Sequence, residues 1–273
     1  MSYAEVNGIR LYYEEHASGR PLILLHGGYG TGEMFAPILP LLAGGRRVIT
    51  VDLRGHGRTA DVDRPLRFQT MGDDIAALIR HLGLGSSAQA DVMGYSLGAA
   101  TALRTAIQHP ALVRRLVVVS HPIRHDGWFP QSLAGFDQMG PEFAEAMKQS
   151  PIYEAYARVA PRVEDWPVLV GKMGTMLRQD YDWSPEVAKI TAPVMLVYGD
   201  ADSVRPSHIA EFYALLGGGL RDANWDGSAR PVARLAIQPS PTHYDIVFSP
   251  DLSNAVVPFL DAASLEPPAP LGQ

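Results

Sequence analysis

Cysteine is missing from this chain of 273 residues. The protein therefore has no disulfide, no thiolate nucleophile and no thiolate metal ligand, which fits a reducing compartment. Runs of Lys and Arg are missing as well, and the formal net charge is -6. Because nothing in this composition attracts a phosphate backbone or an anionic lipid, we expect no nucleic-acid partner.

Long hydrophobic runs are also missing. No apolar stretch approaches the roughly 20 residues that a membrane-spanning helix needs, and residues 1–15 lack the basic and then apolar pattern of a signal peptide. We therefore expect a soluble, cytoplasmic protein with no membrane partner. No cluster of His, Asp and Glu has the spacing of a metal site, so we predict no metal.

Short apolar runs alternate with helical patterns along most of the chain. Asn7-Gly8 supplies the positive φ angles of a two-residue turn and predicts an N-terminal hairpin. The runs predict strands at residues 21–26, 46–53, 90–95, 114–120, 193–199 and 233–239. Helical patterns lie between most of these runs, at residues 71–82, 97–108, 206–216 and 252–263. Unbroken apolar strands that alternate with helices indicate an α/β fold with a mostly parallel, doubly wound sheet buried on both faces.

One interval breaks this alternation. Residues 121–187 contain no convincing buried strand, only helix-like segments separated by Gly and Pro. We predict that this interval is an inserted helical lid and that residues 1–120 and 188–265 form one core. The Pro-containing stretch at residues 266–273 is predicted to be a loose tail.

The predicted lid is rich in aromatic and methionine side chains. Most of them are expected to form a small core within the lid. A few, with Trp128 and Phe136 as candidates, would line an apolar pocket, because an insertion that follows strand 114–120 lies over the carboxyl ends of the strands. His121 directly follows that strand and is a further candidate for the pocket.

The segment DVMGYSLGAAT, residues 91–101, places Ser96 between Gly94 and Gly98. It follows a predicted strand and opens a predicted helix, the context that a G-x-S-x-G nucleophile turn requires. The chain must reverse within a residue or two, and the glycines let neighbouring backbone pack against a strained serine whose hydroxyl points outward. The pattern predicts that Ser96 is a nucleophile.

With these motifs the sequence resembles the α/β-hydrolase family over nearly the whole chain. Besides GYSLG it contains LLHGGYG, DLRGHGRT, GDADSVRP and PTHYDIV, in that family's order. The resemblance implies that His243 is the general base that takes the Ser96 proton. It also implies that the acid follows Gly199 by three positions, which selects Asp202, while Asp200 would bond nearby backbone amides and shape the turn.

The same resemblance implies two backbone donors for a developing oxyanion. One is the amide of Leu97, directly after the nucleophile, and the other belongs to the HGGYG loop, where Gly28 is favoured and Tyr29 is the alternative. Tyr29 is also a candidate for substrate contact. The loop is neither G-x-G-x-x-G nor followed by Lys and Ser/Thr, which argues against a nucleotide site.

These observations predict a serine hydrolase that cleaves carboxylic esters or lactones through an acyl-enzyme on Ser96, without a cofactor. A serine nucleophile also suits carbon–carbon bond hydrolases and haloperoxidase-like perhydrolases, and some proteins that resemble this family are small-molecule receptors with slow hydrolysis. The apolar lid suggests a small, uncharged, apolar substrate. Nothing in the sequence specifies an oligomeric state.

Overall fold

The chain begins with an antiparallel hairpin. In the computed structural model, which describes residues 2–84 and 89–266, β1 (Ser2–Val6) pairs with β2 (Ile9–His16). Asn7 and Gly8 connect them with φ angles of 47° and 77°. Positive φ at both positions is the geometry of a type I′ turn, so the predicted hairpin is confirmed.

Six further strands extend this hairpin into one sheet. They are β3 (Arg20–Leu25), β4 (Arg46–Asp52), β5 (Ala90–Tyr95), β6 (Val113–Val119), β7 (Val194–Ala201) and β8 (Arg234–Thr242). The strand order is β1-β2-β4-β3-β5-β6-β7-β8, and every neighbouring pair from β4 to β8 is parallel. The predicted α/β fold with a mostly parallel, doubly wound sheet is therefore confirmed.

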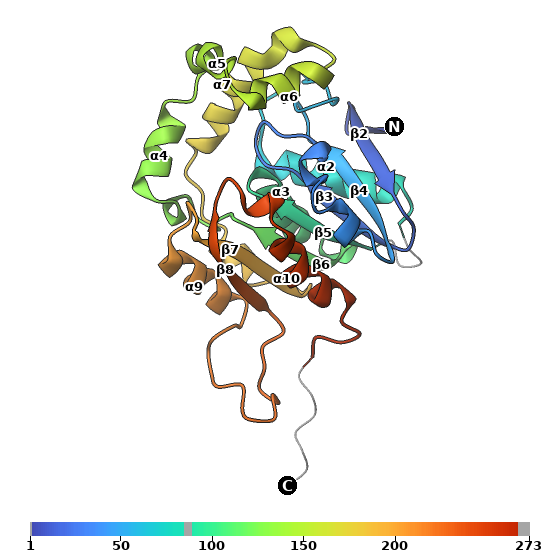
Figure 1. Ribbon diagram of the computed structural model, residues 1–273, viewed down its shortest axis with the longest axis vertical. Coiled ribbons are helices and arrows are strands. Elements are labelled where there is room, and N and C mark those ends of the chain that lie inside the picture. Colours follow the sequence, from blue (N-terminus) through green and yellow to red (C-terminus); the bar gives the residue numbers. More distant parts are fainter. Residues whose placement is uncertain (1, 85–88, 267–273) are drawn as a thin grey trace.

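Both faces of the sheet are covered by helices (Figure 1). Side chains alternate between two apolar clusters along each central strand: in β3, Ile23 and Leu25 join one cluster, and Leu22 and Leu24 join the other. The first cluster includes residues of α2 (Phe68–His81), α3 (Leu97–Gln108) and α9 (Pro206–Leu215); the second includes residues of α10 (Pro250–Asp261). Burial on both sides is the physical reason for the unbroken apolar runs.

Strand β8 departs from this pattern. Only one of its nine residues, Gln238, is buried, and Ile237 is 48% exposed. The prediction that residues 233–239 form a strand buried on both faces is thus wrong in its burial, although the strand exists. The cause is the position of β8, which lies at the edge of the sheet and, among residues 2–84 and 89–266, has β7 as its one partner strand.

Between β6 and β7, a stretch that the structure describes in full, the chain forms helices and loops, with isolated β-bridges at Arg124–Asp182 and Trp128–Val204 but no further strand of the sheet. The helices are α4 (Pro130–Asp137), α5 (Pro141–Met147), α6 (Pro151–Val159), α7 (Trp166–Leu177) and α8 (Ser184–Val187). Figure 1 shows α5, α6 and α7 at the top of the view and α4 at its left. The division into core and lid at residues 121 and 187 stays a prediction, and residues 267–273 of the predicted tail lie outside the described part of the chain.

The helices above the sheet have a small core and fixed attachments. Trp166 is fully buried, contacts the rings of Tyr153 and Tyr156, and donates from Nε1 to the Ala144 carbonyl at 2.9 Å. Lys172 of α7 forms an ion pair with Asp61, in the loop after β4, at 2.6 Å. Within residues 2–84 and 89–266, no helix has the length and apolarity needed to cross a bilayer.

Candidate active site

Ser96 occupies the turn between β5 and α3. Its φ and ψ angles are 52° and -114°, and its amide donates to the Val119 carbonyl of β6 at 2.9 Å. A Cβ on Gly94 would lie 2.1 Å from the Gly98 carbonyl oxygen, and a Cβ on Gly98 would lie 2.0 Å from the Leu25 carbonyl oxygen. Backbone atoms this close admit no side chain, so the two glycines are required for the sharp turn that presents the hydroxyl.

The Ser96 hydroxyl meets an imidazole. Ser96 Oγ lies 3.0 Å from His243 Nε2, and His243 Nδ1 lies 3.2 Å from Asp202 Oδ1. The Asp202 side chain is 1% exposed and the His243 side chain 10% exposed, whereas Ser96 is half-buried. A ring nitrogen in this place can accept the hydroxyl proton, and the carboxylate fixes the tautomer that makes this possible.

The two aspartates of the GDADSVRP segment have different partners. Asp202 accepts hydrogen bonds from the Val204 amide at 3.2 Å and from the Ser120 hydroxyl at 2.5 Å, in addition to its contact with His243. Asp200 is exposed and accepts a hydrogen bond from the Ser240 amide at 2.9 Å. The structure thus brings Asp202, not Asp200, to the imidazole.

A bulge at the end of β8 directs His243 toward Ser96. Gly199 pairs with Gln238 but Ala201 pairs with Thr242, so β8 contains two more residues than β7 over this interval. Ser240 adopts a φ of 86° within it, and a Cβ on Gly199 would lie 2.0 Å from the Pro241 carbonyl oxygen. Bulges of this kind re-aim the following side chain, here the imidazole that comes directly after the strand.

The amides of Leu97 and Gly28 lie on two segments that flank Ser96. Leu97 is the first residue of α3, where the helix leaves its amides without intrahelical acceptors and the dipole favours negative charge. The HGGYG loop approaches from β3: a Cβ on Gly27 would lie 3.5 Å from Ser96 Cβ. Among the described residues, no acceptor bonds the amide of Leu97 or of Gly28.

A protein-family model described as the alpha/beta hydrolase fold matches residues 20–158, just over half of the sequence. The chain belongs to the alpha/beta hydrolase family. It is 25% identical over 242 residues to a putative carbamate hydrolase, RutD, of Azorhizobium caulinodans, covering 82% of this chain and 88% of that protein. It is 29% identical over 215 residues to the pimeloyl-[acyl-carrier protein] methyl ester esterase of Aeromonas hydrophila, covering 71% and 81%.

The same fold is found among solved structures. The crystal structure of E-2-(acetamidomethylene)succinate hydrolase superposes with a TM-score of 0.73 over 95% of this chain and 98% of that one, at 23% identity. This likeness concerns the fold, while the curated relatives support hydrolase activity in general for this alpha/beta hydrolase.

Histidines that support the loops of this alpha/beta hydrolase are held neutral. His26 donates from Nδ1 to the Gly27 carbonyl at 2.7 Å and accepts at Nε2 from the Leu53 amide at 3.0 Å, so it braces the glycine loop. Burial lowers the pKa of His26 to about 4 and, together with the neighbouring His26 ring, that of His56 to about 3. Neither ring carries charge at neutral pH.

Three of the four predicted pocket residues lie together beside His243. The Trp128 ring lies 5.4 Å from the His243 ring and 5.4 Å from the His121 ring, and Phe136 lies 5.5 Å from Trp128. Burial lowers the pKa of His121 to about 3, which keeps it neutral. Tyr29 adopts a φ of 61°, and its ring contacts Trp166 at 5.5 Å and His56 at 6.4 Å instead of this group.

Several residues of this region escape notice in the sequence. Tyr181 and Trp183 stack on His121, and Phe68 packs on all three rings. Ser120 bonds Asp202. Aromatic enrichment of the predicted lid was the available signal for Tyr181 and Trp183, but nothing local marks Phe68 or Ser120, whose partners are distant in the chain.

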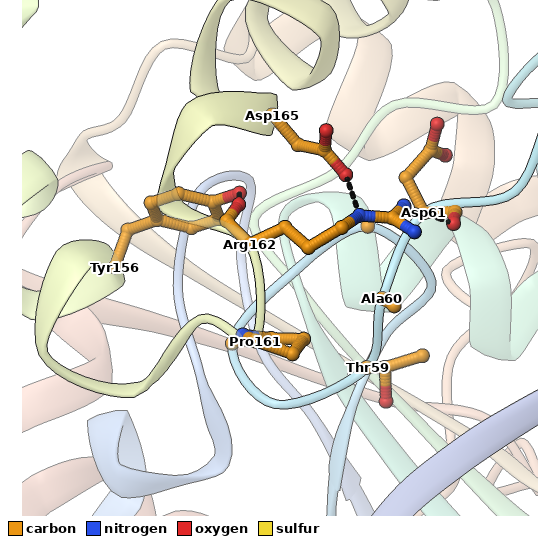
Figure 2. Close-up of a pocket in the computed structure, with 9 residues that line it drawn as sticks. Thr59, Ala60, Asp61, Tyr156, Pro161, Arg162 and Asp165 are labelled. Carbon is orange, nitrogen blue, oxygen red and sulfur yellow. Dashed lines mark hydrogen bonds and ion pairs between the residues drawn. The ribbon is translucent and has the colours of Figure 1, made fainter.

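Two cavities lie apart from Ser96, Asp202 and His243. Figure 2 shows a crevice where Tyr156, Pro161 and the Arg162–Asp165 ion pair face residues 59–61 of the loop after β4, and it has no room for a water molecule. A second cavity of about 220 Å³ lies between the end of α8, the start of β7 and the end of α9. Neither of these two cavities is lined by Ser96, Asp202 or His243.

Proposed function

We propose that this alpha/beta hydrolase cleaves carboxylic esters or lactones by a serine mechanism, with Ser96 as nucleophile, His243 as general base and Asp202 as the orienting acid. The observation that carries the proposal is the unbroken relay from Ser96 Oγ through the His243 ring to Asp202, with contacts of 3.0 Å and 3.2 Å. A hydroxyl is a weak nucleophile at neutral pH until an adjacent base removes its proton.

The reaction follows from these positions. Ser96 Oγ attacks the acyl carbon while His243 Nε2 takes the hydroxyl proton, and the carbonyl oxygen becomes an oxyanion that the Leu97 and Gly28 amides would stabilise. Collapse of this intermediate breaks the bond to the leaving oxygen, which receives the proton from Nε2. Water then attacks the acyl-enzyme, gives its proton to Nε2, and Ser96 regains a proton as the carboxylic acid departs.

The surroundings of His243 support an uncharged, apolar substrate. Trp128 and Phe136 supply buried or half-buried aromatic surface next to the imidazole, and residues 121–187 act as a lid over it. A methyl ester is the substrate that the name of the Aeromonas hydrophila relative states, which supports the ester class here.

Turnover of 4-nitrophenyl acetate and butyrate, together with a panel of lactones and one carbamate ester, tests the proposal. We expect ester or lactone hydrolysis, a fluorophosphonate probe bound to Ser96, and a loss of kcat by several orders of magnitude in Ser96→Ala, because the triad acts as a unit. Probe labelling that persists in Ser96→Ala would place the reactive serine elsewhere. Tight binding of esters with near-zero turnover would indicate a receptor instead.

A further inference from the structure

Ser120, the residue directly after β6, has an unusual backbone and a buried hydroxyl. It is completely buried and adopts a φ of 56°, in the left-handed region that non-glycine residues avoid. Its hydroxyl donates to Asp202 Oδ2 at 2.5 Å, across 82 positions of the sequence. Glycine would suit this backbone better, so the serine side chain calls for an explanation other than local geometry.

The backbone around Ser120 joins the strand of the nucleophile to the strand of the acid. On one side, the Val119 carbonyl accepts the Ser96 amide at 2.9 Å; on the other, the Ser120 amide donates to the Val197 carbonyl of β7 at 3.0 Å. The Ser120 hydroxyl therefore extends from a peptide that is fixed to both neighbouring strands. A donor mounted in this way can hold Asp202 at a fixed distance from the nucleophile turn.

The two carboxylate oxygens of Asp202 depend on Ser120 unequally. Oδ1 has the His243 ring at 3.2 Å and the Val204 amide at 3.2 Å. Oδ2 has Ser120 at 2.5 Å and, among the residues that the structure describes, one further donor, the Gly199 amide at 3.4 Å, which is a long contact. Without the Ser120 hydroxyl, a buried carboxylate oxygen keeps one weak donor, and the carboxylate can rotate away from His243.

We propose that Ser120 is a positioning residue that holds the Asp202 carboxylate in line with His243 through its hydroxyl. The inference rests on the triad proposed above and extends it by a fourth residue that does not touch the substrate. Hydrogen bonds to an ionised carboxylate are among the strong ones, and loss of this bond should affect the imidazole through Asp202 alone.

Two substitutions separate the hydroxyl from the backbone. Ser120→Gly removes the hydroxyl and also relieves the backbone strain of the positive φ. Ser120→Ala removes the hydroxyl but leaves that strain in place. We expect both to lower kcat for 4-nitrophenyl butyrate by about tenfold or more with KM unchanged, while Ser120→Gly melts at the higher temperature. Ser207→Ala, an exposed serine in α9, serves as the control and should match the wild type. If kcat is normal in Ser120→Gly and low in Ser120→Ala, activity follows thermal stability and not the hydroxyl, and the proposal is overturned.

A double-mutant cycle tests whether the effect passes through Asp202. Ser120→Ala should lower kcat no further in an Asp202→Asn background, because the carboxylate that it positions is gone. An equal loss in both backgrounds would mean that Ser120 acts by another route and would overturn the proposal.

A spectroscopic measurement keeps this inference separate from the proposed function. The low-field proton resonance of His243 Nδ1–H, seen by NMR without any substrate, should shift or broaden in Ser120→Gly and stay unchanged in Ser207→Ala. If the resonance shifts but the wild type hydrolyses no ester or lactone, the proposed function fails and the positioning role stands. If the wild type is active and Ser120→Gly leaves both the resonance and kcat unchanged, the positioning role is wrong.

Discussion

Asp200 and Asp202 stand two residues apart at the end of β7, yet one bonds the Ser240 amide at 2.9 Å on the surface and the other reaches the buried His243 ring at 3.2 Å. We therefore expect Asp202→Asn to lower kcat by roughly 10⁴, because the amide no longer holds the productive tautomer of the imidazole. Asp200→Asn should cost little activity and act mainly on stability. Measurement of kcat and melting temperature for both variants checks this; near-wild-type turnover in Asp202→Asn would reject the assignment.

The conformation of Ser96 predicts a conflict between stability and activity. A non-glycine residue at φ 52° and ψ -114° carries strain of about 1–3 kcal/mol. Glycine removes this strain, and the greater entropy that it gives the unfolded chain offsets less than about 1 kcal/mol of the gain in stability. Ser96→Gly should therefore melt above Ser96→Ala, with both variants inactive toward esters. Thermal unfolding followed by circular dichroism measures the difference, and equal melting temperatures would show that the turn is unstrained.

Gly98 and Gly135 form a matched pair for testing close packing. Gly98→Ala places a Cβ 2.0 Å from the Leu25 carbonyl oxygen and should lower the free energy of unfolding by more than about 2 kcal/mol, since backbone cannot move aside cheaply. Gly135 lies in α4 with open space around it, so Gly135→Ala should be neutral or raise stability by up to about 1 kcal/mol. Urea denaturation of both variants decides; a harmless Gly98→Ala would contradict the geometry of the turn.

Buried neutral histidines predict how stability depends on pH. Burial lowers the pKa of His26, His56 and His121 from 6.5 to about 4, 3 and 3. Below pH 6.5 the unfolded chain takes up protons that the folded protein refuses, so the free energy of unfolding falls with falling pH. Each ring contributes a slope of about 1.4 kcal/mol per pH unit until its folded pKa is reached. Buried aspartates with raised pKa, Asp52, Asp74 and Asp91, oppose this trend as they take up protons in the folded state.

His56→Asn isolates one of these contributions. The asparagine amide can still donate to the Arg54 carbonyl, which His56 Nδ1 contacts at 3.0 Å, but it does not titrate. Urea unfolding at pH 6.0, 5.5 and 5.0 should show a slope reduced by about 1.4 kcal/mol per pH unit relative to the wild type. The exposed His81→Asn should leave the slope unchanged, and an unchanged slope in His56→Asn would mean that His56 is not held neutral.

The sequence predicted best where local chemistry decides. The Asn7-Gly8 turn needs positive φ angles, and the turn at Ser96 needs glycines that let backbone atoms approach closely. Few residue types allow either, and the structure has both turns. Ser120 is the opposite case, because its partner Asp202 is 82 positions away and only the alignment of β6 with β7 brings them together. The apolar residues of β8 likewise gave no indication that the strand lies at the edge of the sheet.

No strand within the described part of the chain pairs with the outer side of β8, and the composition of β8 limits what can be added there. Pro239 and Pro241 have no amide hydrogen, so the C-terminal half of the strand cannot donate to a further strand. Residues 234–238 keep all their amide hydrogens, but alternate residues of this stretch already bond β7, so only the others face the open side. A neighbouring molecule that approaches this edge in a crowded solution therefore finds few residues with which to pair, which restrains aggregation through intermolecular β-sheet.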